Sequence, residues 1–232
     1  MIPKAAVAGF MLGQQMGTLP GGSVFQPVGA PLNRDVINRI WADVVKTYPY
    51  QSLQLDPTGR GGRFIGSNPD DIVILQPHLL QIRVFFSDDT LSIAQVAEQI
   101  QSVFKSAVFH IGGSPPINLG VKLIYNAPAP GGNSVDFLRT EFVKGDEDLR
   151  ALAGSMDLQA SIKLVMTDIN KTFTLLIEPL QINKADLYLD LDVQFAGIVD
   201  VGHIKENVMQ TDEFIKGQVQ SFLDRRSEEW TK

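Results

Sequence analysis

The sequence predicts an α+β protein in which helices pack on one face of largely antiparallel sheets. Three observations predict this class: helical patterns separate groups of strand-like runs, turn residues join consecutive runs, and a long helical pattern finishes the chain. Hydrophobic residues make up 44% of the 232 residues, which is enough for a sizeable core. The order of elements also allows an imperfect duplication of three strands and a helix, with residues 51–109 matching 158–224.

The first half is expected to open with a helix. Asn33 can cap it, its apolar residues recur on one face, and Pro49 stops it. The segments that follow are expected to be strands at Gln51–Asp56, Arg63–Gly66 and Ile72–Phe86, a helix at Leu91–Phe109 and a strand at Ile117–Tyr125. Pro77 lacks the donor that a central strand needs, so it marks a bulge, a break into two strands or an edge. Ser92 and Gln95 have the spacing of a capping box.

The second half is expected to end in an antiparallel meander and a long helix. A loop is expected at Asn126–Asn133 because proline, glycine and asparagine dominate it. Asn170 and Asn183 provide turn residues between the strand-like runs. The expected elements are helices at Ser134–Val143 and Asp146–Ala153, strands at Leu158–Met166, Phe173–Glu178 and Asp186–Phe195, and a final helix at Ile204–Asp224.

Residues 1–33 have an unusual composition, with one charged residue, Lys4, and many glycines and prolines. Such a segment offers too little apolar periodicity to offset chain entropy, so we expect an extended arm that cannot fold alone. The arm would precede one α+β domain of residues 34–232, with possible halves at 34–126 and 134–232. Its apolar side chains are expected to dock on the body or on a neighbouring subunit. The expected contact residues are Phe10, Met11, Leu12, Met16, Val24 and Phe25.

Composition excludes several classes of function. The chain holds no cysteine, which removes disulfides, thiolate catalysis and zinc–thiolate sites. The formal charge of −6 provides no field that attracts phosphate backbones, so nucleic acid is not an expected partner. The apolar stretch Ala5–Leu12 is far shorter than the ~20 residues that span a bilayer, and no A-x-A site follows it. We therefore expect a protein with no membrane span. We also expect no cofactor.

One strand-like run suggests a metal site. In Asp186–Val193, strict alternation places leucines on one face of a strand and the acidic residues with Tyr188 on the other. Asp190 and Asp192 would lie roughly 6.5–7 Å apart, a spacing from which two carboxylates can converge on Mg²⁺ or Ca²⁺. The simpler alternative is a half-solvated strand whose wet face carries ordinary polar residues. The sequence shows no obvious third ligand and no phosphate-binding partner nearby.

The segment Thr58–Arg63 is rich in glycine and carries two arginines. Its backbone amides and guanidinium groups can cradle a phosphate or a carboxylate. It matches neither of the common nucleotide-binding glycine motifs, and no helix is expected after it. The alternative is a hairpin loop that its arginines keep solvated. The residues of this candidate anion site are Gly59, Arg60, Gly61, Gly62 and Arg63.

The three histidines give little support to an enzyme. His78 lies at the expected strand break, His110 ends a predicted helix, and His203 precedes the last one. A histidine at a helix C-terminus is favourable for electrostatic reasons alone. The sequence contains no H-x-x-x-H pair and no G-x-S-x-G motif, so zinc-protease and serine-hydrolase activities are not expected.

Three segments resemble those of a family of uncharacterised bacterial proteins of similar length. They are the helix ending in Tyr48-Pro49, the strand Leu119–Asn126 and the late strand Leu187–Val193. That family shares an L-G-x-[RK]-x-x-N-like strand and a late L-D-[IL]-D strand, and the similarity covers residues 33–224. The resemblance implies a bacterial, cytoplasmic protein of unassigned activity, and it carries over no catalytic residues.

These observations favour a non-enzymatic module that binds another protein, or its own copies, through the arm and exposed sheet surfaces. The alternative is a metal- and phosphate-dependent nucleotide-binding or nucleotide-processing protein that uses Asp190 and Asp192 with Arg60 and Arg63. A third alternative is a carrier of small molecules or peptides, which requires a closed apolar cavity between sheet and helices.

Overall fold

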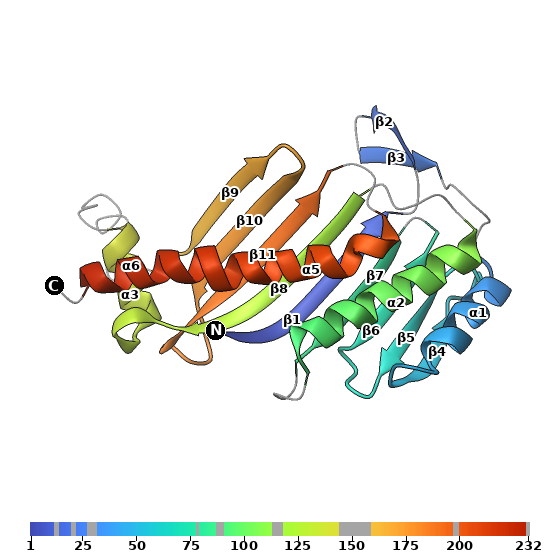
Figure 1. Cartoon of the computed structure of the whole chain (residues 1–232), viewed down its shortest axis with the longest axis horizontal. Helices are drawn as coiled ribbons and strands as arrows, with labels where there is room; N and C mark the ends of the chain where they lie inside the picture. The colour runs from blue at the N-terminus through green and yellow to red at the C-terminus, as the bar shows by residue number, and fades with distance from the viewer. Residues whose placement is uncertain are drawn as a thin grey trace.

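The computed structural model describes residues 1–11, 14–19, 22–26, 32–77, 79–86, 91–112, 118–143, 159–196 and 200–230, with the backbone alone described for 7–26, 118 and 227–230. Within these residues, nine strands form one antiparallel sheet, and helices lie across one of its faces (Figure 1). This arrangement confirms the predicted α+β class.

The first half follows the sequence prediction closely. Its elements are α1 (Arg34–Val44), β4 (Tyr50–Leu55), β5 (Gly62–Gly66), β6 (Ile72–Gln76), β7 (Leu79–Phe85) and α2 (Ile93–Ile111). Asn33 caps α1, because its Oδ1 accepts hydrogen bonds from two backbone amides of the first turn at 3.0 Å each. Ser92 and Gln95 form the predicted capping box of α2. The chain breaks into two strands at Pro77, which was one of the three alternatives.

The second half contains the predicted meander, in which β10 pairs antiparallel with both β9 and β11. Strand β8 runs into the predicted loop as far as Pro128, because its last residues pair with β11. The helix predicted at Asp146–Ala153 lies outside the described residues. The elements are β8 (Asn118–Pro128), η1 (Pro130–Gly132), α3 (Ser134–Phe142), β9 (Ile162–Asp168), β10 (Lys171–Pro179), β11 (Asp186–Phe195), η2 (Val201–His203), α5 (Ile204–Phe214), the π-helical η3 (Ile215–Val219) and α6 (Gln220–Trp230).

The N-terminal segment differs from the prediction. Ile2–Met11 forms β1, which lies in the middle of the sheet and pairs antiparallel with β7 and β8. The expectation of an extended arm over residues 1–33 is therefore wrong for residues 2–11, which form a central strand of the large sheet. Ala5 and Ala6 point to opposite faces of β1, and both are buried. Because Ile2–Met11 mixes proline, lysine and glycine with small apolar residues, it lacks the usual alternation that predicts a strand.

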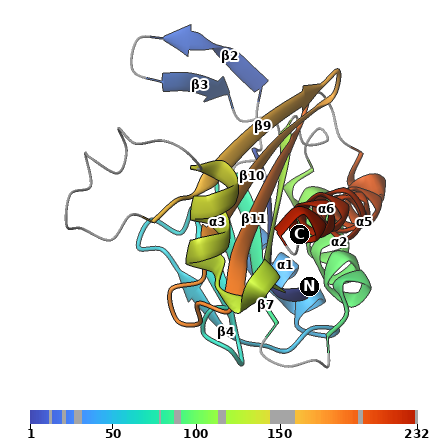
Figure 2. The ribbon, with the colours of Figure 1, turned by 90° about the vertical axis from the view of Figure 1, so that its left-hand side faces the viewer.

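After β1 the chain forms a second, two-stranded sheet. Its strands are β2 (Gln14–Leu19) and β3 (Gly22–Gln26), which pair antiparallel with each other. Figures 1 and 2 show these two strands projecting beyond the strand ends of the large sheet. We call β2 and β3 together the ribbon.

The core lies between the large sheet and the helices. Helices α2, α5 and α6 lie across one face, α1 packs beside α2, and α3 closes the end near β10 (Figures 1 and 2). Alternate residues of β8 face these helices and are at most 2% exposed, namely Leu119, Val121, Leu123, Tyr125 and Ala127. Burying one leucine in this way stabilises the fold by roughly 1.5–3 kcal/mol. Among the described residues, no helix is long and apolar enough to cross a bilayer.

The sheet order supports the duplication that the sequence allowed. The order is β4-β5-β6-β7-β1-β8-β11-β10-β9, and every pairing is antiparallel. Outward from the centre, β7, β6 and β5 follow β1 as β11, β10 and β9 follow β8. Helix α2 follows β7 along the chain as α5 follows β11. The two halves therefore have the same strand order outward from the central pair of β1 and β8, and β4 has no counterpart among the described residues.

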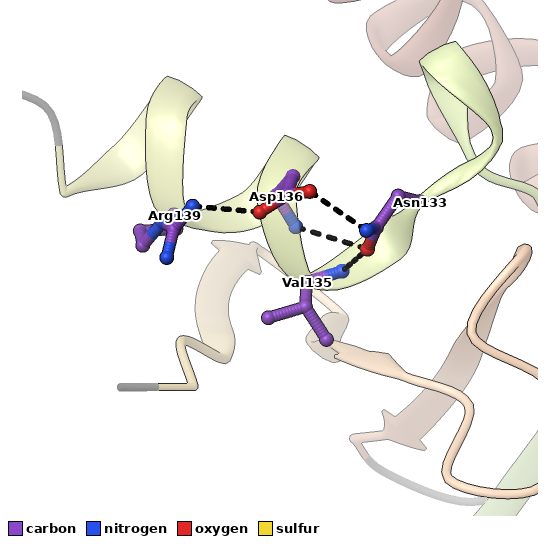
Figure 3. Close-up of polar contacts among 4 residues, drawn as sticks. All are labelled: Asn133, Val135, Asp136 and Arg139. Atoms are coloured by element: carbon purple, nitrogen blue, oxygen red, sulfur yellow. Dashed lines mark hydrogen bonds and ion pairs between the residues drawn. The ribbon is translucent and has the colours of Figure 1, made fainter. Parts of the chain in front are cut away.

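Helix α3 starts at a cap that Figure 3 shows in detail. Asn133 Oδ1 accepts hydrogen bonds from the backbone amides of Val135 and Asp136 at 3.1 and 3.2 Å. The Asp136 carboxylate accepts one hydrogen bond from Asn133 Nδ2 at 2.7 Å and another from Arg139 at 2.6 Å. These contacts satisfy first-turn amides and fix where the chain leaves β8 to enter α3.

Candidate interaction surface

The predicted contact residues divide between two elements. Phe10 and Met11 lie in β1, where their backbones pair with β7 and β8 inside the sheet. This corrects their assignment to a docking arm, because a central strand pairs on both edges and cannot leave the sheet without breaking it. Met16, Val24 and Phe25 lie in the ribbon. The ribbon is thus the part of the expected arm that remains a candidate contact element.

The ribbon pairs with no other strand in the part of the chain that the structure describes. A two-stranded hairpin alone is marginally stable at best in water. Residues 14–26 include no Asp, Glu, Lys or Arg, so charged side chains do not solvate the ribbon. Contact with another surface would stabilise an element of this kind. Leu12, the remaining predicted contact residue, lies outside the described residues.

The glycine-rich segment forms the loop between β4 and β5, and Asp56 organises it. Asp56 Oδ1 accepts hydrogen bonds from the Thr58 hydroxyl at 2.8 Å and from the Arg60 amide at 3.1 Å. The Thr58 bond, followed by backbone amides, holds the pKa of Asp56 below its ordinary value. A Cβ on Gly61 would lie 2.9 Å from the backbone oxygen of Leu75 and 2.6 Å from Asp56 Oδ2, so glycine is needed there. The loop therefore already holds an anion, which is its own carboxylate.

The five residues of the candidate anion site are not brought together around one point. Gly59 and Arg60 line a pocket of about 650 Å³ together with Arg34 from the start of α1. Gly62 and Arg63 belong to β5, where they pair with residues of β4 and β6. The side chains of Arg34, Arg60 and Arg63 are all exposed to solvent.

The acidic residues of β11 lie on the face of the sheet opposite α2 and α5. Asp190 Oδ2 lies 2.7 Å from Lys122 Nζ on β8, and the Asp190 side chain is 13% exposed. Asp192 Oδ1 accepts a hydrogen bond from Gln194 Nε2 at 2.5 Å. Among the described residues, no three acidic or histidine side chains gather closely enough to hold a metal ion. The Lys122 ammonium group occupies the position next to Asp190 that a cation would take.

A groove between β10 and α5 was not visible in the sequence, because its residues come from segments far apart in the chain. Lys171 Nζ donates a hydrogen bond to Gln210 Oε1 at 2.7 Å and lies 5.1 Å from the centre of the Phe195 ring. A pocket of about 460 Å³ on one side of Lys171 includes His203 and Glu206. None of the predicted site residues lies in this pocket.

His110 has a structural role at the contact between two helices. Its Nε2 lies 2.6 Å from Asp43 Oδ2, which joins the end of α2 to α1. This hydrogen bond, followed by one from Lys46, holds the pKa of Asp43 below its ordinary value. His78 lies outside the described residues.

One buried polar cluster escaped the sequence analysis. Tyr125 of β8 is fully buried and donates a hydrogen bond to Asp212 Oδ1 of α5. Asp212 is itself only 3% exposed. Lys216 donates a hydrogen bond to Asp212 Oδ2 at 2.9 Å. Burial raises the pKa of the Tyr125 hydroxyl, and Asp212 raises it further, so the hydroxyl remains a donor. The signal in the sequence was an aspartate within the apolar stripe that contains Val208 and Ile215.

Comparison with known proteins adds little to this geometry. No family model matches the sequence, and no curated protein matches it. Among solved structures, the chain is similar to the S. pombe Pct1 RNA triphosphatase at 6% identity, over 97% of this chain and 84% of that chain, with a TM-score of 0.14. A likeness at this TM-score carries no argument about fold or function.

Proposed function

We propose that the protein is a non-enzymatic interaction or assembly module whose ribbon docks on another protein or on a second copy of the chain. The ribbon is the observation that supports this function. It is uncharged, it forms a sheet of its own, and it projects from the large sheet (Figure 2). The strand β1 anchors it, since the chain passes from the centre of the large sheet directly into the ribbon.

The energetics of a lone ribbon favour docking. Fixing each backbone residue costs about 1–2 kcal/mol, and one pair of short strands does not provide a core to offset this. Apolar surface removed from water contributes roughly 25 cal/mol per Å², so a partner surface can provide the missing stabilisation. Attachment to a central strand limits the freedom of the ribbon in advance, which reduces the entropy lost on docking.

The test is a chain in which Gln14–Gln26 is replaced by a Gly-Ser linker. Gln14 and Gln26 are paired neighbours, so a short linker can join the flanking residues without moving β1 or α1. Removing residues 1–31 would not serve, because it also removes β1 from the centre of the sheet. The ribbon-deleted chain is expected to unfold cooperatively like the full chain and to lose its assembly mass in light scattering or its capture of a partner.

A point-variant series gives a matched control within the ribbon. Replacing Met16, Val24 and Phe25 by serine removes apolar surface and keeps the length of the ribbon. This variant is expected to weaken assembly or partner capture, whereas a variant with Gln14 and Thr18 changed to alanine is expected to behave like the unmodified chain. The proposal fails if the ribbon-deleted chain keeps the assembly state and the partners of the full chain.

The metal- and phosphate-dependent alternative receives no specific support from the described residues. Lys122 is paired with Asp190, and the Arg60 amide in the glycine-rich loop is bound to Asp56. We therefore propose no second function.

A further inference from the structure

The large sheet ends in two edge strands of different character. At β4, the pairing with β5 shifts between Tyr50 and Ser52, Pro49 precedes the strand, and three of its residues are exposed and polar. Irregular, polar edges of this kind are protected from pairing with other chains. At the other edge, β9 keeps an unbroken register with β10 from Ile162 to Asp168 and contains neither proline nor glycine. Strand β9 therefore has no register shift and no proline at its edge, and its exposed polar residues are Lys163, Thr167 and Asp168.

Strand β9 also carries incompletely buried apolar side chains on both of its faces. Val165, on the face opposite the helices, is 61% exposed. Ile162, Leu164 and Met166 pack against the core from the other face but are only partly buried. Within the described ranges, no strand pairs with the outer edge of β9. An added strand would satisfy the outward backbone groups and cover apolar surface on both faces.

The internal duplication indicates which kind of element suits this edge. Strand β5 is the counterpart of β9 in the first half, and its outer edge pairs antiparallel with β4. The fold therefore already accommodates an antiparallel strand at the equivalent position. In the second half, the described part of the chain supplies none.

A second copy of β9 matches the edge in pattern. Antiparallel pairing centred on Val165 places this residue opposite Val165 of the second copy. The same register places Leu164 opposite Met166 and Lys163 opposite Thr167, so apolar residues meet on both faces and no like charges lie opposite each other.

Charge also permits this antiparallel register, in which Lys163 lies opposite Thr167 and Asp168 lies opposite Ile162. In this register the two Lys163 residues lie roughly 13 Å apart along the strands. Parallel pairing in register would instead oppose like charges directly.

We infer that two copies of the chain associate by antiparallel pairing of their β9 strands, which joins their sheets into one. This inference does not rest on the ribbon, which is a separate element. It gives the second copy a defined position, with the twofold axis of the dimer passing beside Val165.

Val165 provides a sharp test, because one substitution there places like charges against each other in the dimer. Val165→Lys and Val165→Glu are each expected to raise the dissociation constant, measured by sedimentation equilibrium, by more than about tenfold. An equimolar mixture of the two variants is expected to regain the dimer, since lysine then meets glutamate. Val165 is mostly exposed, so neither change removes core packing. Ile182→Lys, at a residue that is 91% exposed in the turn after β10, is the matched control and should associate normally.

Several results would overturn the inference. The first is an unmodified chain that remains monomeric at every concentration. The second is a Val165→Lys variant that associates as strongly as the unmodified chain. The third is a mixture of Val165→Lys and Val165→Glu that does not form the dimer. A monomer in which the outward amides of β9, those that do not point to β10, are already protected from hydrogen exchange would show that another segment covers the edge. A dimer that depends on the ribbon and not on Val165 would also overturn it, and would leave the proposed ribbon contact intact.

Discussion

Tyr125 donates a hydrogen bond to Asp212 across the core, from the strand β8 to the helix α5. Both residues are buried, and Asp212 lies in the last turn of α5, just before the π-helical segment η3. A buried carboxylate is costly unless it is paired and hydrogen-bonded. The Lys216 ammonium group provides the second contact, and its side chain is half exposed, so the cluster connects the core to solvent.

Removing the Tyr125 hydroxyl is expected to destabilise the fold. Tyr125→Phe leaves a buried carboxylate oxygen of Asp212 without its donor, which costs about 1–3 kcal/mol of the free energy of unfolding. Urea denaturation measures this loss. Tyr188→Phe is the control, since that hydroxyl lies 3.4 Å from Asp190 and is only partly buried, and its expected cost is below about 0.5 kcal/mol. Equal losses of unfolding free energy in the two variants would show that the Tyr125–Asp212 hydrogen bond does not stabilise the fold.

Asp71 is expected to give the stability a measurable pH dependence. Burial raises the pKa of this carboxyl above its ordinary value, although it accepts a hydrogen bond from the Phe85 amide at 2.6 Å. The folded state therefore holds the proton to a higher pH than the unfolded state. The stability contributed by this group is full below the unfolded pKa of about 4 and declines as pH rises through the folded pKa.

Asp71→Asn keeps an acceptor for the Phe85 amide and removes the ionisation. The free energy of unfolding of the variant, relative to the unmodified chain, is expected to increase from about pH 3 to about pH 7. Denaturation at a series of pH values measures this difference directly. A difference that stays constant, or that falls with pH, would contradict the assignment.

Strand β1 is expected to be essential for folding. A chain that starts at Leu32 lacks the strand between β7 and β8, so both of these lose a hydrogen-bonded neighbour in the centre of the sheet. We expect this truncated chain to show no cooperative thermal unfolding by circular dichroism. The ribbon-deleted chain serves as its control, because it keeps β1. Cooperative unfolding of the truncated chain would restore the original expectation of a separable arm.

The acidic strand β11 is expected not to bind a catalytic metal. Titration calorimetry of the full chain with Mg²⁺ or Mn²⁺ and a panel of nucleotides should give no binding heat, since Lys122 neutralises Asp190. Binding heat that is present in the unmodified chain and absent in the Asp190→Asn/Asp192→Asn double variant would contradict this prediction. It would support the metal- and phosphate-dependent alternative.

The sequence predicted the local elements well because their signals are local. Caps such as Asn33, the Ser92–Gln95 box and the break at Pro77 act over a few residues. The phase of the last helix was harder to predict. In α6, Leu223 is 3% exposed, whereas Phe222 is only partly buried. The wide turn of η3 shifts the face that α6 presents to the core, and no sequence pattern marked that turn.

The non-local features could not be predicted. Strand β1 showed no alternation, because Ile2–Met11 mixes Pro3, Lys4 and Gly9 with apolar residues, and its central place depends on pairing with β7 and β8, which lie far along the chain. The ion pair of Lys122 with Asp190 joins two strands far apart in the chain, and it depends on a register that appears only once β8 and β11 are paired. Without that register, Asp190 and Asp192 looked like free ligands.

The most direct test of the ribbon contact is photo-crosslinking in the cells that produce the protein. A photoreactive residue takes the place of Phe25 in the full chain, and a matched chain carries it at the exposed residue Ile182. The proposed function predicts that the ribbon position forms one defined crosslinked product, with a second copy or with another protein, and that the control position does not. No product from the ribbon, or the same products from both positions, would contradict it.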